Sequence, residues 1–303
     1  MENQTSQPEF ILLGLSDLTE FWIPLFLLIL FSFMATLVGN FLIIFLVATD
    51  SHLQTPMYIF LSNFSAVDIL SPCVSASHLL FDIFTGNTVI LYTTCIAQVY
   101  FFTWFVSTEI FLLGIMSYDR YVAICHPLHY TTIISIHLCV QLMAGLWVFS
   151  SAYSLMHTLC TLRLVFCGPT TIPGLLCELY QFIQLSCSDT SLSYFLLSIL
   201  AVSFAVFVLF ITFLSYVYIF RTILQIKMKN GRSKAYSTCS SHLTVVLIYY
   251  VTTFFNYVQP KTRNLFVSRL VSVVYIFFTP FLNPLIYSLR NSELQGALYR
   301  ALV

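Results

Sequence analysis

Seven long apolar runs dominate this chain and restrict what it can fold into. Most reach the length of about 20 residues that a helix needs to cross the hydrocarbon layer of a membrane. None shows the alternation expected of a barrel strand. The runs cover residues 21–48, 57–80, 96–118, 138–162, 192–220, 243–258 and 265–289. We therefore predict an all-α membrane protein, a seven-transmembrane helix bundle with a short cytoplasmic amphipathic helix at residues 291–298.

The composition agrees with a membrane location. Hydrophobic residues make up 59% of the 303 positions, and only 8% are charged, whereas soluble domains carry about 25% charge. The formal net charge is zero, so nothing favours nucleic acid as a partner. Since no repeat or linker divides the chain, we expect one domain over residues 1–303. It would comprise an extracellular tail (1–20), the bundle (21–289) and a cytoplasmic tail (290–303).

The basic residues predict the orientation, because cytoplasmic loops are enriched in Lys and Arg. With the N-terminus outside, eight basic residues fall on the cytoplasmic side: Arg120, Arg221, Lys227, Lys229, Arg232, Lys234, Arg290 and Arg300. The other four, Arg163, Lys261, Arg263 and Arg269, fall outside or just within the last span. We expect a multi-pass protein of the plasma membrane with an extracellular N-terminus, embedded in membrane lipid.

Two further features fit this orientation. Asn3 begins an Asn-Gln-Thr glycosylation sequon in the exterior tail, where such sites are modified. Four cysteines fall on exterior segments, where oxidising conditions allow disulfides, and they permit three pairings. They are Cys95, Cys167, Cys177 and Cys187.

Two carboxylates interrupt the second and third apolar runs, at Asp68 and Glu109. Ionisable groups at membrane depth are costly and usually face the bundle interior. One interpretation is that they are protonated and hydrogen-bonded to polar neighbours. The other is that both ionise around a sodium ion, because carboxylate oxygens suit small hard cations. The residues alone leave both open, and we expect no cofactor other than this sodium ion.

Two unusual motifs end the third and seventh runs. Met116–Tyr130 spells MSYDRYVAICHPLHY, and Pro280–Asn291 spells PFLNPLIYSLRN. Pro284 lies deep in the last span, where proline removes a backbone hydrogen bond and kinks a helix. Such a kink is tolerated where a neighbour satisfies the freed carbonyl.

These motifs, with several others, resemble the olfactory (odorant) receptors, a family of rhodopsin-like class A G-protein-coupled receptors. The resemblance runs from Glu9 to the end of the chain. Its other motifs are Gly39-Asn40, LQTPMY at 53–58, LSNFSAVD at 61–68, Ser215-Tyr216 and KAYSTCSSHL at 234–243. Each is modest alone, but their order along the chain is specific.

The resemblance implies a role for many of these residues. It pairs Cys95 with Cys177 and Cys167 with Cys187. It implies that Arg120 contacts the G protein, that Tyr216 and Tyr287 swing toward it in the active state, and that Asn40, Asp68 and Asn283 form a polar core. The residues assigned to coupling and switching are Asp119, Arg120, Tyr121, Tyr216, Tyr250, Asn283, Pro284 and Tyr287. Val251 departs from the family, which usually has glycine there, whereas Tyr250 keeps the aromatic at the pocket floor.

By the same analogy, the outer halves of the third, fifth, sixth and seventh spans line a ligand cavity. The lining residues would be Phe102, Thr103, Val106, Ser107, Leu200, Phe204, Thr253, Phe254, Tyr257, Val273 and Ile276. None is charged, so we expect a small, neutral, mostly apolar odorant. The partner would be a heterotrimeric G protein of the stimulatory olfactory type, which raises cyclic AMP, and the location olfactory sensory cilia.

The segment from Arg221 to His242 contains no Asp or Glu. In many relatives an acid on the sixth span holds the arginine of the third span. That ion pair is impossible here, so we expect signalling without ligand. The main alternatives are a seven-helix transporter, which would favour internal repeats, and a chemoreceptor with a non-odorant ligand. We find no catalytic cluster and expect no enzyme.

Overall fold

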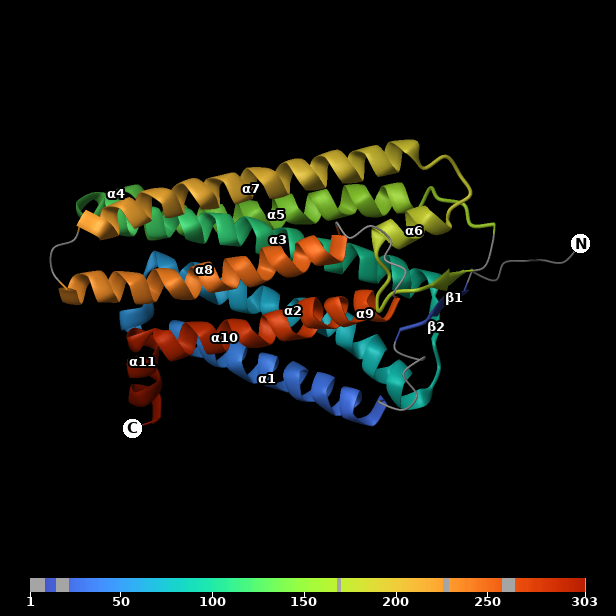
Figure 1. The fold of residues 1–303 in the computed structure, drawn as a ribbon, viewed down its shortest axis with the longest axis horizontal. Coiled ribbons are helices and arrows are strands. Elements are labelled where there is room, and N and C mark those ends of the chain that lie inside the picture. The colour runs from blue at the N-terminus through green and yellow to red at the C-terminus, as the bar shows by residue number, and fades with distance from the viewer. Residues whose placement is uncertain (1–8, 15–21, 168–169, 226–228, 258–264, 303) are drawn as a thin grey trace, which may run out of the picture.

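The computed structural model describes residues 9–14, 22–167, 170–225, 229–257 and 265–302. All seven predicted spans are helical within it, and their long helices lie side by side along the longest axis of the molecule (Figure 1). They are α1 (Trp22–Thr49), α2 (Pro56–Thr85), α3 (Tyr92–Cys125), α5 (Ile136–Thr161), α7 (Ser191–Gln225), α8 (Lys229–Tyr257) and a last span of α9 (Leu265–Val273), η3 (Val274–Phe278) and α10 (Thr279–Arg290). The seven-helix bundle is confirmed.

Several helices extend beyond the apolar runs that predicted them. Among the described residues, six of the spans are long and apolar enough to cross a membrane, whereas the apolar part of α8 covers Cys239–Phe254. The polar start of α8 stays helical because backbone hydrogen bonding continues beyond the lipid, where hydropathy gives no signal. At the start of the apolar part, Cys239 packs against Ile219 and Ile223 of α7.

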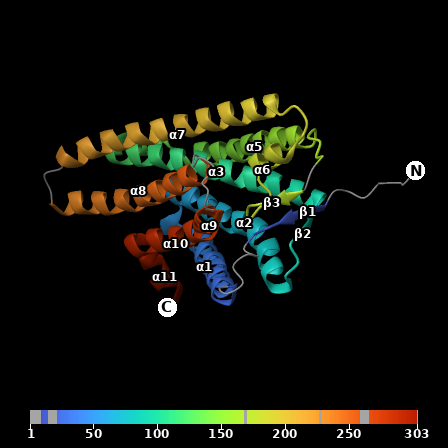
Figure 2. The ribbon, with the colours of Figure 1, turned by 45° about the vertical axis from the view of Figure 1, so that its right-hand side comes forward.

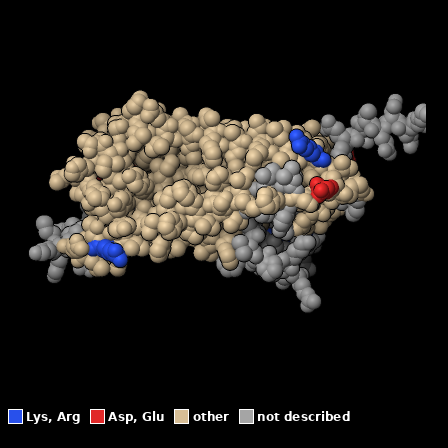
Figure 3. Space-filling model, turned by 90° about the horizontal axis from the view of Figure 1, so that it is seen from above, with Lys and Arg blue, Asp and Glu red and all other residues tan. Residues whose placement is uncertain are grey.

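The flank of the bundle is apolar, and its polar groups lie inside. Large side chains such as Phe41 and Phe213 are more than 60% exposed, whereas Asp68 is 1% exposed. In the face that Figure 3 shows, charged side chains appear only toward the two ends, and the length between them carries none. A surface of this kind suits lipid as its solvent.

A small sheet covers one end of the bundle, called the sheet end below (Figure 2). β1 (Glu9–Leu12) is its central strand, antiparallel to β2 (Val89–Leu91) and parallel to β3 (Thr171–Ile172). Phe10 is fully buried, and its ring lies 5.2 Å from that of Phe182 in the short helix α6 (Leu179–Leu185). The chain near the N-terminus is thereby packed against loops far away in sequence.

The opposite end carries α11 (Ser292–Leu302), which turns away from the bundle axis (Figure 1). Asn291 caps it, since its side-chain oxygen accepts from the N–H of Glu293 at 3.0 Å. Leu294 and Ala297 are buried at 2% and 1% exposure. The predicted helix at 291–298 is therefore present and longer than expected. This α11 end also holds η1 (Ser51–Leu53), η2 (Pro127–His129) and α4 (Tyr130–Ile133).

An ion pair fastens α11 to the turn after α1. Arg300 donates from Nε to the Asp50 carboxylate at 2.9 Å. The hydrogen bond from Arg300, followed by one from the backbone N–H of His52, lowers the pKa of Asp50 to about 2. Asp50 therefore stays charged at any ordinary pH.

Candidate ligand cavity and polar core

Asn40 and Gly39 of α1 accommodate the proline kink in the last span. Pro284 cannot donate to the carbonyl of Pro280, four residues earlier. The side-chain amide of Asn40 donates to that carbonyl at 3.3 Å. A Cβ at Gly39 would lie 3.1 Å from the ring of Pro284, so any side chain there would push α1 and Pro284 apart by a few tenths of an ångström. A neighbouring helix thus satisfies the freed carbonyl.

Asp68 and Asn283 form the centre of a buried polar core. The Asn283 amide donates to both carboxylate oxygens of Asp68 at 3.0 Å. Glu109 is buried nearby on α3, at 6% exposure. The side-chain oxygens of Asn40 and Asn283 are buried with no hydrogen-bond partner among the described residues. Over the same residues, no three His, Cys, Asp or Glu side chains gather as a metal site.

A π-helical turn, η3, lies between α9 and α10. Pro280 has no N–H to donate to the carbonyl of Ile276, four residues earlier. The N–H of Thr279 donates to the carbonyl of Val274, five residues earlier, and this spacing makes the turn π-helical. Such turns are rare and frequent at functional sites. Tyr275 on this turn is 5% exposed, with its ring 6.4 Å from Phe102 and 6.0 Å from Tyr249.

Several predicted cavity residues lie together at this level of the bundle. Phe102 on α3 and Val273 and Ile276 on the last span are buried, and Val106 on α3 is half-buried. Tyr249 of α8 donates to the Val106 carbonyl at 3.3 Å. α3, α8 and the last span thus surround a common region. On α3, Thr103 is half-buried. The Ser107 hydroxyl donates to the Trp104 carbonyl of the same helix at 3.0 Å.

Other predicted residues lie elsewhere. Phe204 of α7 packs between Phe111 and Tyr153, both 5.6 Å from its ring, on the side of α5. Phe254 is 58% exposed, so the bundle does not enclose its side chain. The prediction that Phe254 lines the cavity is therefore wrong. The helical phase of α8 explains this, because Thr253 is half-buried one position earlier. Leu200 is half-buried on α7, and Tyr257 is the last residue of α8.

Three buried hydroxyls in this region make no hydrogen bond of good geometry among the described residues, and those of Thr253 and Tyr275 are close enough to interact with each other. The three belong to Tyr250 and Thr253 of α8 and to Tyr275 of η3. Buried polar atoms normally have a partner, so these groups could receive a polar atom of a ligand. The sequence analysis did not identify Tyr249 or Tyr275 as site residues. For Tyr275 the available signal was the Thr-Pro at 279–280, which predicts a backbone irregularity nearby.

Five of the predicted switch residues lie toward the α11 end, namely Asp119, Arg120, Tyr121, Tyr216 and Tyr287, whereas Tyr250, Asn283 and Pro284 lie deeper in the bundle. The Tyr216 hydroxyl lies 2.6 Å from Nδ1 of His242, which joins α7 to α8. Arg120, His242 and Tyr287 line one small cavity. Tyr130 donates to the Asp119 carboxylate at 2.8 Å, and Tyr121 is hydrogen-bonded to His126 at 3.1 Å. His242 is a further candidate that sequence analysis quoted in a motif without assigning it a role.

Two disulfides hold the sheet end. Cys95 at the start of α3 is bonded to Cys177, with Cα atoms 5.4 Å apart, and Cys167 is bonded to Cys187 across 20 residues. This is the pairing that the family resemblance implies. The predicted glycosylation residue, Asn3, lies outside the described residues.

The chain has seven apolar spans, a proline inside the last span next to a buried polar core, and a disulfide that ties the third span to a loop. Together these features define a seven-transmembrane receptor of the G-protein-coupled class. A sequence model of the family named olfactory receptor matches residues 29–303. The dog olfactory receptor-like protein OLF4 is 44% identical over 98% of this chain and 97% of its own length. Human olfactory receptor 1J1 is 44% identical (99% and 94% covered), and mouse olfactory receptor 1M1 is 45% identical (98% and 95%). The chain belongs to the olfactory receptor family.

Membership confirms the predicted family and settles the coarse function. The protein is a multi-pass membrane receptor that binds a small molecule and couples to a G protein, and it is not an enzyme. The transporter interpretation is thereby set aside.

Proposed function

We propose that the receptor binds small, neutral, mostly apolar odorants between α3, α8 and the last span, and signals through the stimulatory olfactory G protein to raise cyclic AMP. The observation that carries the ligand class is the mixture of apolar side chains with hydroxyls that make no hydrogen bond of good geometry. Phe102, Val273 and Ile276 supply apolar surface, and Thr253 and Tyr275 offer hydroxyls. A charged ligand would have no counter-ion among the predicted lining residues.

A matched pair of threonines tests the cavity. The Thr253 hydroxyl makes no hydrogen bond of good geometry among the described residues, whereas its neighbour Thr252 donates to the Ile248 carbonyl at 2.8 Å. Cells that supply the olfactory G protein are screened with volatile compounds, with Arg120→Ala as the inactive control. Thr253→Val should raise the half-maximal concentration of a hydrogen-bonding odorant about 2- to 10-fold, and Thr252→Val should leave it unchanged. Equal effects would refute this cavity, and no response to any volatile compound at verified surface expression would indicate a chemoreceptor with a non-odorant ligand.

Activation is a shift in population between two conformations of the receptor. The size of the shift is set by the difference between the ligand's affinities for the two conformations. We place the sheet end outside the plasma membrane of olfactory cilia and the α11 end in the cytoplasm. Because the 221–242 segment lacks an acid, Arg120 has no ion pair to α8, and neutral contacts such as Tyr216 with His242 hold the inner face. We expect basal cyclic AMP above that of mock-transfected cells at verified surface expression. A signal no higher than mock would contradict this.

A second proposal concerns sodium at the polar core. Asp68 and Glu109 would hold the ion. The unpartnered side-chain oxygens of Asn40 and Asn283 are metal ligands of the kind that sodium takes. The ion would neutralise the buried carboxylates and favour one conformation of the bundle. Glu109→Gln should abolish a sodium dependence of agonist potency. A response insensitive to sodium, unchanged by this substitution, would remove the ion.

A further inference from the structure

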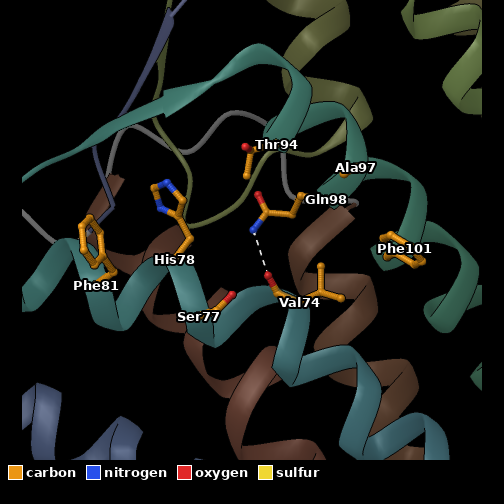
Figure 4. A pocket seen from close by; sticks show the side chains of 8 residues that line it. All are labelled: Val74, Ser77, His78, Phe81, Thr94, Ala97, Gln98 and Phe101. Atoms are coloured by element: carbon orange, nitrogen blue, oxygen red, sulfur yellow. Dashed lines mark hydrogen bonds between the residues drawn. The ribbon is translucent and has the colours of Figure 1, made fainter.

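A groove between the sheet-end halves of α2 and α3 lies apart from the odorant cavity (Figure 4). Its volume of about 390 Å³ is within the range of small-molecule sites. Phe81 of α2 and Phe101 of α3 stand at its two ends (Figure 4), and they are 54% and 40% exposed. The groove therefore opens on the lipid-facing flank, where a component of the membrane can reach it.

The middle of the groove is polar. Figure 4 shows His78 of α2 and Gln98 and Thr94 of α3 directed into the same space. His78 lies 2.8 Å from Asp82 through Nδ1, which fixes the ring and leaves Nε2 on its other side. The hydroxyls of Thr94 and Ser77 are exposed, with no partner in the part of the chain that the structure describes. Polar groups at a lipid-facing surface are costly unless bonded, so a hydroxyl-bearing ligand suits them.

Gln98 connects this groove to the covering loops. It is 5% exposed, and its amide donates to the Val74 carbonyl of α2 at 3.3 Å. Its side-chain oxygen accepts from the N–H of Cys177 at 2.9 Å. A ligand packed on Gln98 would therefore stabilise α2, α3 and the disulfide-bonded loop together.

We propose that this groove binds a membrane sterol, with the sterol hydroxyl at His78 and Thr94 and its rings against Ala97 and Phe101. The polar groups lie at a suitable depth, since His78 is seven residues before the end of α2, about 10 Å along a helix. A rigid ring system loses little conformational entropy on binding. A phospholipid headgroup would find no Lys or Arg among the residues that line the groove.

The test uses the full chain in nanodiscs that contain a photoreactive sterol, with labelled peptides identified by mass spectrometry. Ala97→Trp fills the groove, and Ala201→Trp, at an exposed alanine of α7, is the matched control. We expect labelling within residues 74–101, lost in Ala97→Trp and retained in Ala201→Trp. Equal labelling of the two variants, or labelling only elsewhere, would overturn the proposal.

The polar half of the proposal has its own readouts, which do not depend on the tryptophan variant folding. Thr94→Val keeps the shape of the side chain and should lower labelling about 2- to 10-fold. Unlabelled sterol should compete, whereas its 3-methyl ether should compete poorly. If the ether competes as well as the free sterol, hydroxyl recognition is wrong. Because no odorant or G protein is used, failure here is distinct from failure of the proposed function.

Discussion

Two helix glycines differ in what surrounds them, and this difference yields a quantitative prediction. A Cβ at Gly39 of α1 would lie 3.1 Å from both Cβ and Cγ of Pro284, whereas a Cβ at Gly145 of α5 would have nothing within 4 Å. Carbon atoms pack best at about 3.5–4.0 Å. The proline ring is rigid and lies at the kink of the last span, so it cannot turn away as a flexible side chain would.

The expected magnitudes follow from this geometry. Each Gly→Ala change favours the helix by up to about 1 kcal/mol. Gly145→Ala should therefore be neutral or stabilising. Gly39→Ala adds an overpacking cost of about 1–3 kcal/mol. The difference between the two variants is then about 1–3 kcal/mol, or several degrees of melting temperature at about 2–4 °C per kcal/mol.

The assay is thermal unfolding of both purified variants in the same detergent, followed by a thiol-reactive dye. Gly39→Ala should melt below wild type or level with it, and below Gly145→Ala by several degrees. If Gly39→Ala melts level with Gly145→Ala, then α1 and Pro284 are not in close contact and the description of the kink is wrong.

Three further predictions concern the polar core and the two ends. Asn40→Leu leaves the Pro280 carbonyl without its donor and should cost about 1–3 kcal/mol; an unchanged melting temperature would contradict it. Phe10→Ala removes a fully buried ring at about 3–5 kcal/mol, so amides of β1 and β2 should lose protection in hydrogen exchange, and retained protection would argue against the sheet. The depressed pKa of Asp50, about 2, means that its pairing with Arg300 stabilises fully above about pH 4 and is lost as the pH falls toward 2. A spin label on α11 should then become mobile across that window, and in Asp50→Asn it should be mobile at every pH.

The seven spans could be predicted because each is a local, continuous apolar run, and a membrane crossing requires little else. The short helix after Asn291 could be predicted from its sparse apolar positions at Leu294, Ala297 and Leu298, whereas its cap could not. Boundaries were less accurate, as in α8, because a helix continues into water without a hydropathy signal. The sheet was not predicted, since its strands have two to four residues and come from three distant segments.

The cavity shows a similar division. The family analogy predicts that Phe102 and Ile276 line the cavity, and both are buried, but the exposure of Phe254 depends on the rotation of α8 in the bundle. Tyr275 entered the site through a π-helical turn, which follows from Pro280 only once the neighbouring backbone is known. The contact between Tyr216 and His242 joins two helices and has no periodic signature.

By itself the amino-acid sequence determined the class, the number of crossings, the family and the missing acid in the 221–242 segment. Each of these properties depends on which residue types occur and on their order within short stretches of the chain. Only the tertiary structure decided that Asn40 serves Pro280, that Gly39 lies against Pro284, and that Gln98 joins α2 to the Cys177 loop. The physical reason is that each of these contacts joins residues far apart in the chain, and which ones meet is decided by how helices pack and rotate against one another.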